Sequence, residues 1–318
     1  MVYIPGLGSS SFPGGLAGVP GPAGSSGTSG YGVSTADGRL TTVSGTPILT
    51  TTQSAKTTLY YTPFKGNQIA VYSGSVWSVL TFAETSLSLS GFTASKNYDI
   101  WGYNNAGVLA LDSTVWTNDT TRATALTTQD GIYCKTGDTT RRYLGTVRIN
   151  STGGQIDWAP SSNGSGGVEV KATIWNENNR ILFSFTNRDV TTSWTHAANG
   201  TWVSLNGSTN NRFTFVLGRS VEQIEADLSV RATTVSGGTG TVAFGLDITS
   251  APASNQLFGP TSGTTNTPYV SATAKYANHI SAGNHYLQAL DYSVTQITTF
   301  YGYTNPYTQS GMLVRGWF

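Results

Sequence analysis

Residues 68–82 read Gln68-Ile-Ala-Val-Tyr-Ser-Gly-Ser-Val-Trp-Ser-Val-Leu-Thr-Phe82, and this stretch decides the fold. Apolar and aromatic residues lie on both sides of a short Ser-Gly-Ser connection, with polar residues between them at strand-like spacing. Two strands with a buried face each, joined by a short connection that contains glycine, form an antiparallel hairpin. The stretch predicts a β-hairpin, and the same texture elsewhere predicts an all-β protein.

The same pattern extends outward through the first half of the chain. A strand is predicted at residues 58–62, just before Pro63, and a second hairpin at residues 98–111 around Asn104-Asn-Ala-Gly. Gln129-Asp-Gly predicts a further turn, and strands are predicted at residues 132–135 and 143–149. Turns recur about every ten residues, as in β-sandwiches and barrels. Residues 31–150 are therefore predicted to form one β-rich module.

The second half of the chain, residues 168–318, is predicted to be a C-terminal β-sandwich that is jelly-roll-like. Residues 150–167 are a loop of low complexity, and residues 151–167 are predicted to be a linker between the halves. The pattern at residues 221–231 fits a short helix or a strand, and periodicity does not decide between them. The aromatic end of the chain predicts a C-terminus packed in a sheet. Strands are predicted at residues 168–175, 180–185, 212–217, 241–248, 285–292, 298–303 and 312–318.

Glycine occupies every third position near the N-terminus, and Pro20 and Pro22 lie among these glycines. Only glycine fits at the crowded axis of a collagen triple helix, so the period predicts a short collagen-like stalk over residues 15–30 and a homotrimer. A flexible Gly/Ser/Pro linker has a similar composition but needs no strict period. Five triplets cannot hold three chains together alone, so trimerisation is expected from the β body. The stalk glycines are Gly15, Gly18, Gly21, Gly24, Gly27 and Gly30.

Composition limits the partners of the chain. Of its 318 residues only 10% are charged, and the net charge is +1. No basic surplus is available for a nucleic-acid backbone, so no nucleic-acid partner is expected. No run approaches the roughly 20 apolar residues that span a membrane, so no membrane insertion is expected. The N-terminus lacks the pattern of a signal peptide, and Cys134, the single cysteine, is predicted to be a small buried hydrophobe.

No catalytic constellation is apparent in the sequence, and the chain is predicted not to be an enzyme. The three histidines, His196, His279 and His285, are not clustered with acidic residues or cysteine, so no metal and no cofactor are predicted. Gly-x-Ser-x-Gly is absent. Glu222, Glu225 and Asp227 lie close together, but the better interpretation of these carboxylates is a solvated face of the protein.

Aromatic residues suggest where the chain could bind sugars. Trp194 and Trp202 flank a polar loop, and sugars stack on such rings while Asn and Asp bind their hydroxyl groups. The alternative places one tryptophan in the core and the other at a contact between chains, because large aromatics dominate both. Tyr303, with Tyr301 and Tyr307 nearby, is a weaker candidate. The predicted glycan-binding residues are Trp194, Trp202 and Tyr303.

Several short sequence motifs in the chain resemble those of structural proteins of tailed bacteriophages, especially minor tail, collar and fibre proteins. These motifs are at residues 40–48, 58–72, 77, 98–100, 122–126, 129–131, 141–148, 175–181, 299–302 and 310–312. The resemblance covers most of the body and carries no catalytic residues. It implies a virion component made in the host cytoplasm, a homotrimer, and attachment to other virion proteins through residues 1–30, with residues 1–14 as the anchoring segment.

Together these patterns favour a trimeric phage fibre or spike that adheres to a glycan of the host surface. One alternative is a purely structural protein that decorates or joins parts of the head, collar or tail. A polysaccharide depolymerase is a less favoured alternative, because it needs two carboxylates across a cleft and sequence cannot pair them.

Overall fold

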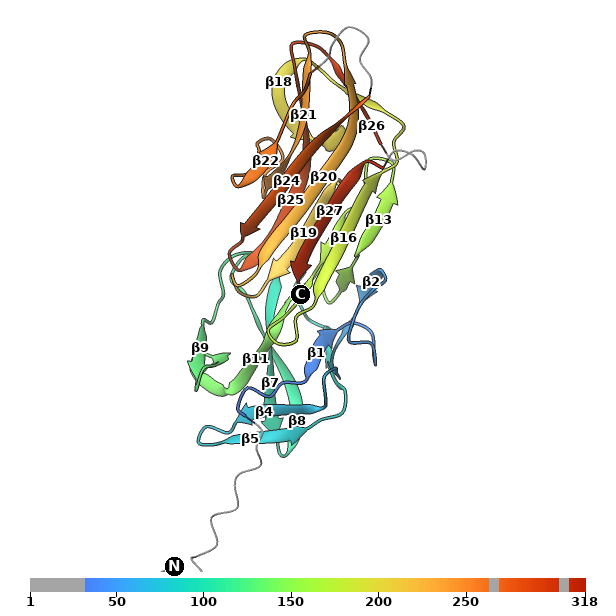
Figure 1. Ribbon diagram of the computed structural model, residues 1–318. Coiled ribbons are helices and arrows are strands. Elements are labelled where there is room, and N and C mark those ends of the chain that lie inside the picture. The colour runs from blue at the N-terminus through green and yellow to red at the C-terminus, as the bar shows by residue number, and fades with distance from the viewer. Residues whose placement is uncertain (1–31, 263–268, 303–308) are drawn as a thin grey trace, which may run out of the picture.

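The computed structural model of the protein describes residues 32–262, 269–302 and 309–318. The predicted anchor (1–14), the predicted stalk (15–30) and Tyr303 lie outside these residues. Within them, all regular structure is β except for one short 3-10 turn, η1 (Leu205–Gly207), so the predicted all-β class is confirmed. The molecule is elongated, with one group of sheets stacked on another (Figure 1).

The first group of sheets contains most strands of residues 32–176. One sheet has six strands, in the order β8-β7-β11-β10-β9, with β15 also paired to β11; smaller sheets pair β1-β3-β6, β4-β5 and β12-β2. The strands are β1 (Gly38–Thr41), β2 (Gln53–Lys56), β3 (Thr58–Pro63), β4 (Gln68–Tyr72), β5 (Trp77–Thr81), β6 (Thr85–Ser88), β7 (Asn97–Asn105), β8 (Val108–Val115), β9 (Leu126–Gln129), β10 (Ile132–Lys135), β11 (Asp138–Arg148), β12 (Ile156–Trp158) and β15 (Ile174–Asn176).

The predicted hairpins of this half are confirmed. Strands β4 and β5 pair from Gln68 with Thr81 to Tyr72 with Trp77. Strands β7 and β8 enclose a two-residue loop, Ala106-Gly107, in which both residues have positive φ. Two-residue hairpin loops favour this left-handed geometry, because it matches the twist of the strands.

The second group of sheets forms a β-sandwich. An eight-stranded sheet runs β13-β16-β27-β20-β24-β22, with β26 also paired to β20 and β17 paired to β26, and a six-stranded sheet runs β14-β19-β25-β21-β23, with β18 beside β25. The strands are β13 (Ser161–Gly164), β14 (Val170–Ala172), β16 (Leu182–Asp189), β17 (Trp194–His196), β18 (Asn199–Ser204), β19 (Arg212–Leu217), β20 (Gln223–Thr234), β21 (Thr239–Leu246), β22 (Gln256–Phe258), β23 (Thr261–Ser262), β24 (Val270–His279), β25 (Gly283–Val294), β26 (Thr298–Tyr301) and β27 (Gly311–Trp317).

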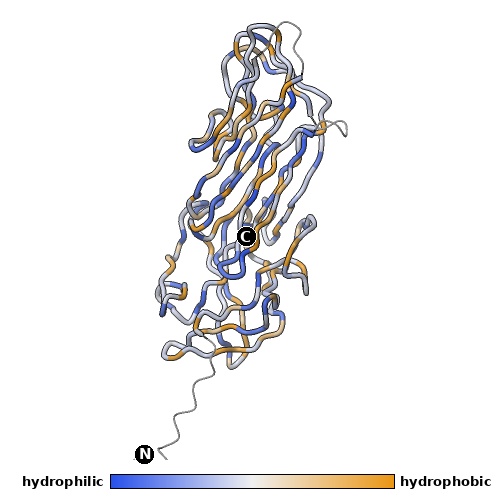
Figure 2. The backbone as a smooth tube through the Cα atoms, viewed as in Figure 1, coloured by the Kyte–Doolittle hydropathy of each residue, from blue (hydrophilic) through white to orange (hydrophobic). Residues whose placement is uncertain are grey.

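Alternating side chains hold the two sheets of the sandwich face to face. Buried and exposed residues alternate along β16, β20 and β24, and hydropathy changes along these strands in Figure 2. The ring of Phe185 on β16 packs 4.6 Å from that of Phe213 on β19, across the sandwich. The ambiguous segment at residues 221–231 is a strand, β20, because its apolar side chains alternate with a period of two.

The segment predicted to be a linker, residues 151–167, contains ordered strands instead. Strand β12 pairs with β2 and buries Ile156 and Trp158. Strand β13 pairs in parallel with β16. Both strands are short, and the Ser/Asn/Gly-rich sequence around them is typical of a loop, so it does not indicate that the tryptophan is buried. The predicted domain boundaries stay a prediction, but this segment is packed into the body.

One hydrophobic core runs through both groups of sheets, from Ala36 to Phe318. Phe318 is fully buried and its ring lies 5.6 Å from that of Phe185. The backbone oxygen of Phe318 accepts a hydrogen bond from Arg39 at 3.0 Å. The predicted packing of the C-terminus is therefore confirmed, and Figure 1 places this end at the junction of the two groups.

Candidate functional site

A depression of about 320 Å³ lies in the sandwich where β17, β18 and η1 meet β25. Strand β17 pairs with β26. Both β26 and β18 lie at the end of the molecule farthest from β4 and β5 (Figure 1). The depression is lined by Trp194, Thr195, His196, Ala197, Asn199, Val203, Asn206, Gly207 and Asp291. It therefore contains one of the predicted sugar-binding residues, Trp194.

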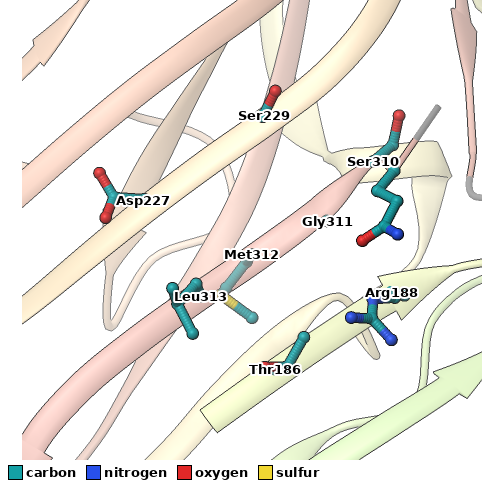
Figure 3. A pocket seen from close by; sticks show the side chains of 9 residues that line it. Thr186, Arg188, Asp227, Ser229, Ser310, Gly311, Met312 and Leu313 are labelled. Carbon is teal, nitrogen blue, oxygen red and sulfur yellow. The ribbon is translucent and has the colours of Figure 1, made fainter. Parts of the chain in front are cut away.

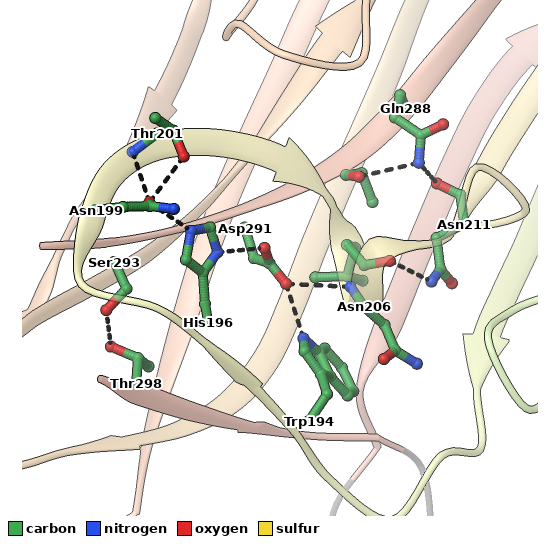
Figure 4. Close-up of polar contacts among 12 residues, drawn as sticks. Trp194, His196, Asn199, Thr201, Asn206, Asn211, Gln288, Asp291, Ser293 and Thr298 are labelled. Atoms are coloured by element: carbon green, nitrogen blue, oxygen red, sulfur yellow. Dashed lines mark hydrogen bonds and ion pairs between the residues drawn. The ribbon is translucent and has the colours of Figure 1, made fainter. Parts of the chain in front are cut away.

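Asp291, on β25, organises this depression. Its side chain is 1% exposed and accepts hydrogen bonds at 2.7 Å from Trp194 Nε1, at 2.7 Å from His196 Nδ1 and at 3.1 Å from the backbone N–H of Asn206. Figure 4 shows the three donors converging on this carboxylate. A buried carboxylate requires such partners, and here it ties β17 and η1 to β25.

His196 is held as an ion-pair partner of Asp291. Its Nε2 lies 3.3 Å from Asn199 Oδ1, and that oxygen is identified by the donors that it accepts, the backbone N–H and hydroxyl of Thr201. Both ring nitrogens thus face acceptors, which suits the doubly protonated ring. The hydrogen bond to Asp291 raises the pKa of His196. The contacts with Asp291 and Asn199 hold this ring in place between β25 and the start of β18.

A second buried carboxylate, that of Asp189, holds Asn206, which lines the depression. Asp189 accepts hydrogen bonds from Asn206 Nδ2 at 2.8 Å and from Asn211 Nδ2 at 3.0 Å. Burial raises the pKa of Asp189, but the bonds from Asn211, Asn206 and Thr191 outweigh it and hold the pKa below its usual range. Asn206 has a left-handed backbone, with φ of 57°, which asparagine tolerates better than most residues.

The Trp194 ring provides the apolar wall. It stacks on Phe300 with a centroid distance of 5.9 Å and an interplanar angle of 20°. The indole is half-buried and its nitrogen is bound to Asp291, so its position is fixed before any ligand arrives. A fixed aromatic wall beside amide groups offers stacking and hydrogen bonding to a sugar ring.

The structure does not bring Trp202 to the same wall. Its ring contacts Tyr292 at 4.9 Å and Phe258 at 5.5 Å. Its neighbour Val203 lines the depression, and successive side chains of a strand point to opposite faces. Trp202 therefore belongs to a separate aromatic cluster, and Tyr303 lies outside the described residues.

Sequence reasoning missed Asp291 and Asn206. Asp291 is 97 residues from Trp194 in the chain, and only strand pairing brings them together. A weak signal was available, because Asp291 occupies the buried face of β25 together with Ala289 and Ser293. A carboxylate at a buried strand position implies polar partners from elsewhere.

The other candidate residues have structural surroundings. Cys134 is a buried free thiol, as predicted, and burial raises the pKa of that thiol. His279 is exposed, whereas His285 is buried beside Asp247 at 2.7 Å. Among the described residues no group of three or more His, Cys, Asp or Glu could hold a metal ion.

Carboxylates on β20, and on the segment just before it, form ion pairs. Glu222 contacts Arg180 at 3.2 Å and Asp227 contacts Arg315 at 3.2 Å. Asp227 lines a hollow on the sheet that has no second carboxylate among its described lining residues, and Glu222 lines neither this hollow nor the depression at Trp194. No helix in the described parts of the chain has the length and apolar character to cross a bilayer.

Comparisons with known proteins provide little information about this chain. No family model matches the chain, and no curated protein matches it. Among solved structures it is similar to the insecticidal delta-endotoxin Cry8Ea1 from Bacillus thuringiensis, with a TM-score of 0.22 and 7% identity over 83% of this chain. The match spans about half, 49%, of that toxin chain. A similarity this weak carries no argument about function.

Proposed function

We propose that the chain is the subunit of a homotrimeric fibre or spike of a tailed bacteriophage. In this proposal residues 1–30 attach it to the virion, and the sandwich adheres to a glycan of the host surface. The observation that carries the adhesion role is the depression walled by Trp194, which combines a fixed indole with amide groups of Asn199 and Asn206.

The position of the depression supports this role. Strand β18, which lines it, lies at the end of the molecule farthest from β4 and β5 (Figure 1). The chain enters the body beside β4, where Asp37 N donates to Gln68 O at 2.9 Å. A site for a host surface has to face away from the attached end of a fibre. An N-terminal attachment and a distal sandwich satisfy this requirement.

The chemistry of the depression favours a neutral or weakly polar sugar. The carboxylate of Asp291 is buried and its oxygens bind Trp194 and His196, both at 2.7 Å, so it presents no free negative charge to a ligand. Of the lining residues, Thr195, Asn199 and Gly207 are exposed and Asn206 is half-buried. These groups can exchange hydrogen bonds with sugar hydroxyls while the ring lies against Trp194.

A glycan array of bacterial surface polysaccharides, probed with the full-length protein, tests the adhesion role. We expect binding to at least one neutral polysaccharide and a loss of about fivefold or more in affinity in Trp194→Ala, because stacking contributes about 1 kcal/mol or more for each ring. Trp194→Phe should retain part of the affinity, since a ring remains over Phe300.

Trp317→Ala is the matched control. Trp317 is 42% exposed on β27, so the substitution removes the same side chain away from the depression. Equal affinity of the wild type and Trp194→Ala would reject the site. Absence of any saccharide binding would favour the decoration or joining role, and cleavage of a bound polysaccharide would favour a depolymerase.

A further inference from the structure

A second polar site lies on the outer face of the eight-stranded sheet. Two adjoining hollows of about 260 Å³ and 400 Å³ share Ser229, Gln309 and Ser310. The smaller, called the Arg188 hollow, is lined by side chains of the neighbouring strands β16, β27 and β20 (Figure 3). The larger, called the Arg231 hollow, adds Arg231, Tyr269 and Ser271.

Arg231 is fixed by aromatic rings at the back of its hollow. Its guanidinium carbon lies 3.3 Å from the ring centroid of Tyr269 and 4.8 Å from that of Tyr301. Its Nε is buried and has no hydrogen-bond partner in the described parts of the chain. The backbone N–H of Arg231 donates to Ser310 Oγ, which in turn donates to Tyr301 O at 2.6 Å. A guanidinium held by packing loses little freedom when it binds an anion.

The charges around the hollows leave a positive surplus. Asp227, which lines the Arg188 hollow, is paired with Arg315 at 3.2 Å and with Lys275 at 3.8 Å. Arg231 lines the larger hollow, and none of the described residues around that hollow carries a carboxylate. A buried or half-buried arginine recognises a carboxylate through two parallel hydrogen bonds.

The remaining lining is suited to a sugar. Tyr269 is 57% exposed, so part of its ring is open to solvent, and among the described residues the ring contacts Arg231 and Tyr301. Ser229, Ser271 and Gln309 supply hydroxyl and amide groups around it. Hydroxyls, an aromatic ring and a fixed guanidinium match the groups of a sugar that carries a carboxylate.

We infer that the two hollows form a binding site for an acidic saccharide, with Arg231 pairing with the carboxylate of a uronic acid and Tyr269 packing against its ring. The inference deepens the proposed function and rests on its premise that the sandwich binds saccharides. It places acid recognition on the outer sheet face, separate from the neutral depression at Trp194.

Calorimetric titration of the full-length protein with tetragalacturonate tests the inference. The neutral probe is the same tetramer with its carboxyl groups reduced to alcohols. We expect the wild type to bind the acidic form at least tenfold more tightly than the reduced form, and Arg231→Gln to lose at least tenfold in affinity for the acidic form. The affinity should also fall as salt is added, because the pairing is electrostatic.

Lys275→Gln is the matched control, since it removes the same charge from the same sheet face. Lys275 does not line either hollow, its side chain is 75% exposed, and Asp227 keeps its closer pair with Arg315, so the loss of Lys275 should change the affinity less than twofold. Tyr269→Ala covers the case in which Arg231→Gln fails to fold. Its exposed ring is dispensable for the core, and we expect a loss of several-fold in affinity.

Three results would overturn the inference: no binding of tetragalacturonate by the wild type, equal binding of the reduced tetramer, or unchanged affinity in Arg231→Gln and Tyr269→Ala. Trp194→Ala separates this site from the first. If that variant abolishes tetragalacturonate binding, the acid binds at the Trp194 depression and the inference fails. If Trp194→Ala loses affinity only for neutral polysaccharides, both sites are supported. If the wild type binds no neutral polysaccharide but its binding of tetragalacturonate still requires Arg231, only the proposed neutral site is wrong.

Discussion

Several of the few charged residues in this chain lie inside the protein, each with polar partners. Asp99 is 1% exposed and receives hydrogen bonds from Arg122 Nε and Thr146 Oγ1, both at 2.7 Å. Asp291 and Asp189 have comparable partners around the depression. Removing one member of such a pair leaves the other buried and unpaired, which costs more than the pair contributes. These positions should therefore tolerate substitution poorly.

The pair of His196 and Asp291 predicts a pH-dependent stability. The folded state raises the pKa of His196, so its stabilising effect is complete below the unfolded-state pKa of about 6.5 and is lost as pH rises through the folded-state pKa. We expect His196→Gln to lower the free energy of unfolding by about 2 kcal/mol at pH 6, and by less at pH 9. Urea unfolding of both proteins at the two pH values measures this difference.

His279→Gln is the control for this measurement, because His279 is exposed at the end of β24. It should leave the free energy of unfolding nearly unchanged at both pH values. A loss in His196→Gln that grows with rising pH would contradict the assignment of His196 as the protonated partner.

Local elements of this fold can be predicted from the sequence because their causes are local. The Asp130-Gly131 turn joins β9 and β10 with positive φ at both residues, and the Asp-Gly pair indicates such a turn directly. Strands β12 and β13 could not be found in this way. Each has at most four residues, and partners far away in the chain, β2 and β16, define them.

The candidate site was predictable only in part, for the same reason. The sequence identifies Trp194 as an aromatic residue beside a polar loop. It does not identify Asp291, because pairing between β18 and β25 sets that contact. The hollows on the outer sheet face arise in the same way, from β16, β27, β20 and β24 lying side by side.

Strand β11 holds the start of the described chain, and this predicts a strong effect at one residue. Arg142 is 1% exposed and donates to the backbone oxygens of Val33, Thr35 and Ala70 at 2.7–3.1 Å, and to that of Ser34 at 3.0 Å. We expect Arg142→Ala to lower the free energy of unfolding by about 3 kcal/mol, because buried carbonyl groups lose their donors. Chemical unfolding measures the loss, and limited proteolysis should cut near residues 33–35.

Arg141 gives the matched control on the same strand. Its side chain is 25% exposed, pairs with Asp112 and lies over the ring of Tyr103 at 3.8 Å. Arg141→Ala should cost less than about 1 kcal/mol, as expected for a surface pair. Equal losses in the two variants would show that charge in general, and not the buried contacts of Arg142, stabilises this part of the chain.

The whole molecule is one packed body whose ends differ in character. Contacts across the junction include Arg122 with the backbone oxygen of Gly218, and Arg219 with Glu177 at 2.6 Å. The chain enters near β4, where Asp37 N donates to Gln68 O, while β18, which borders the depression at Trp194, lies at the opposite end (Figure 1). This polarity is what a fibre needs, with attachment at one end and adhesion at the other.

Assembly is the central claim at the scale of the whole molecule, and the solution mass tests it most directly. Light scattering should be measured on the full-length chain and on a form that lacks residues 1–30. We predict a mass near three chains for both, because five Gly-x-y triplets cannot hold a trimer and the β body must do so. A monomeric mass for both forms would contradict the proposed fibre.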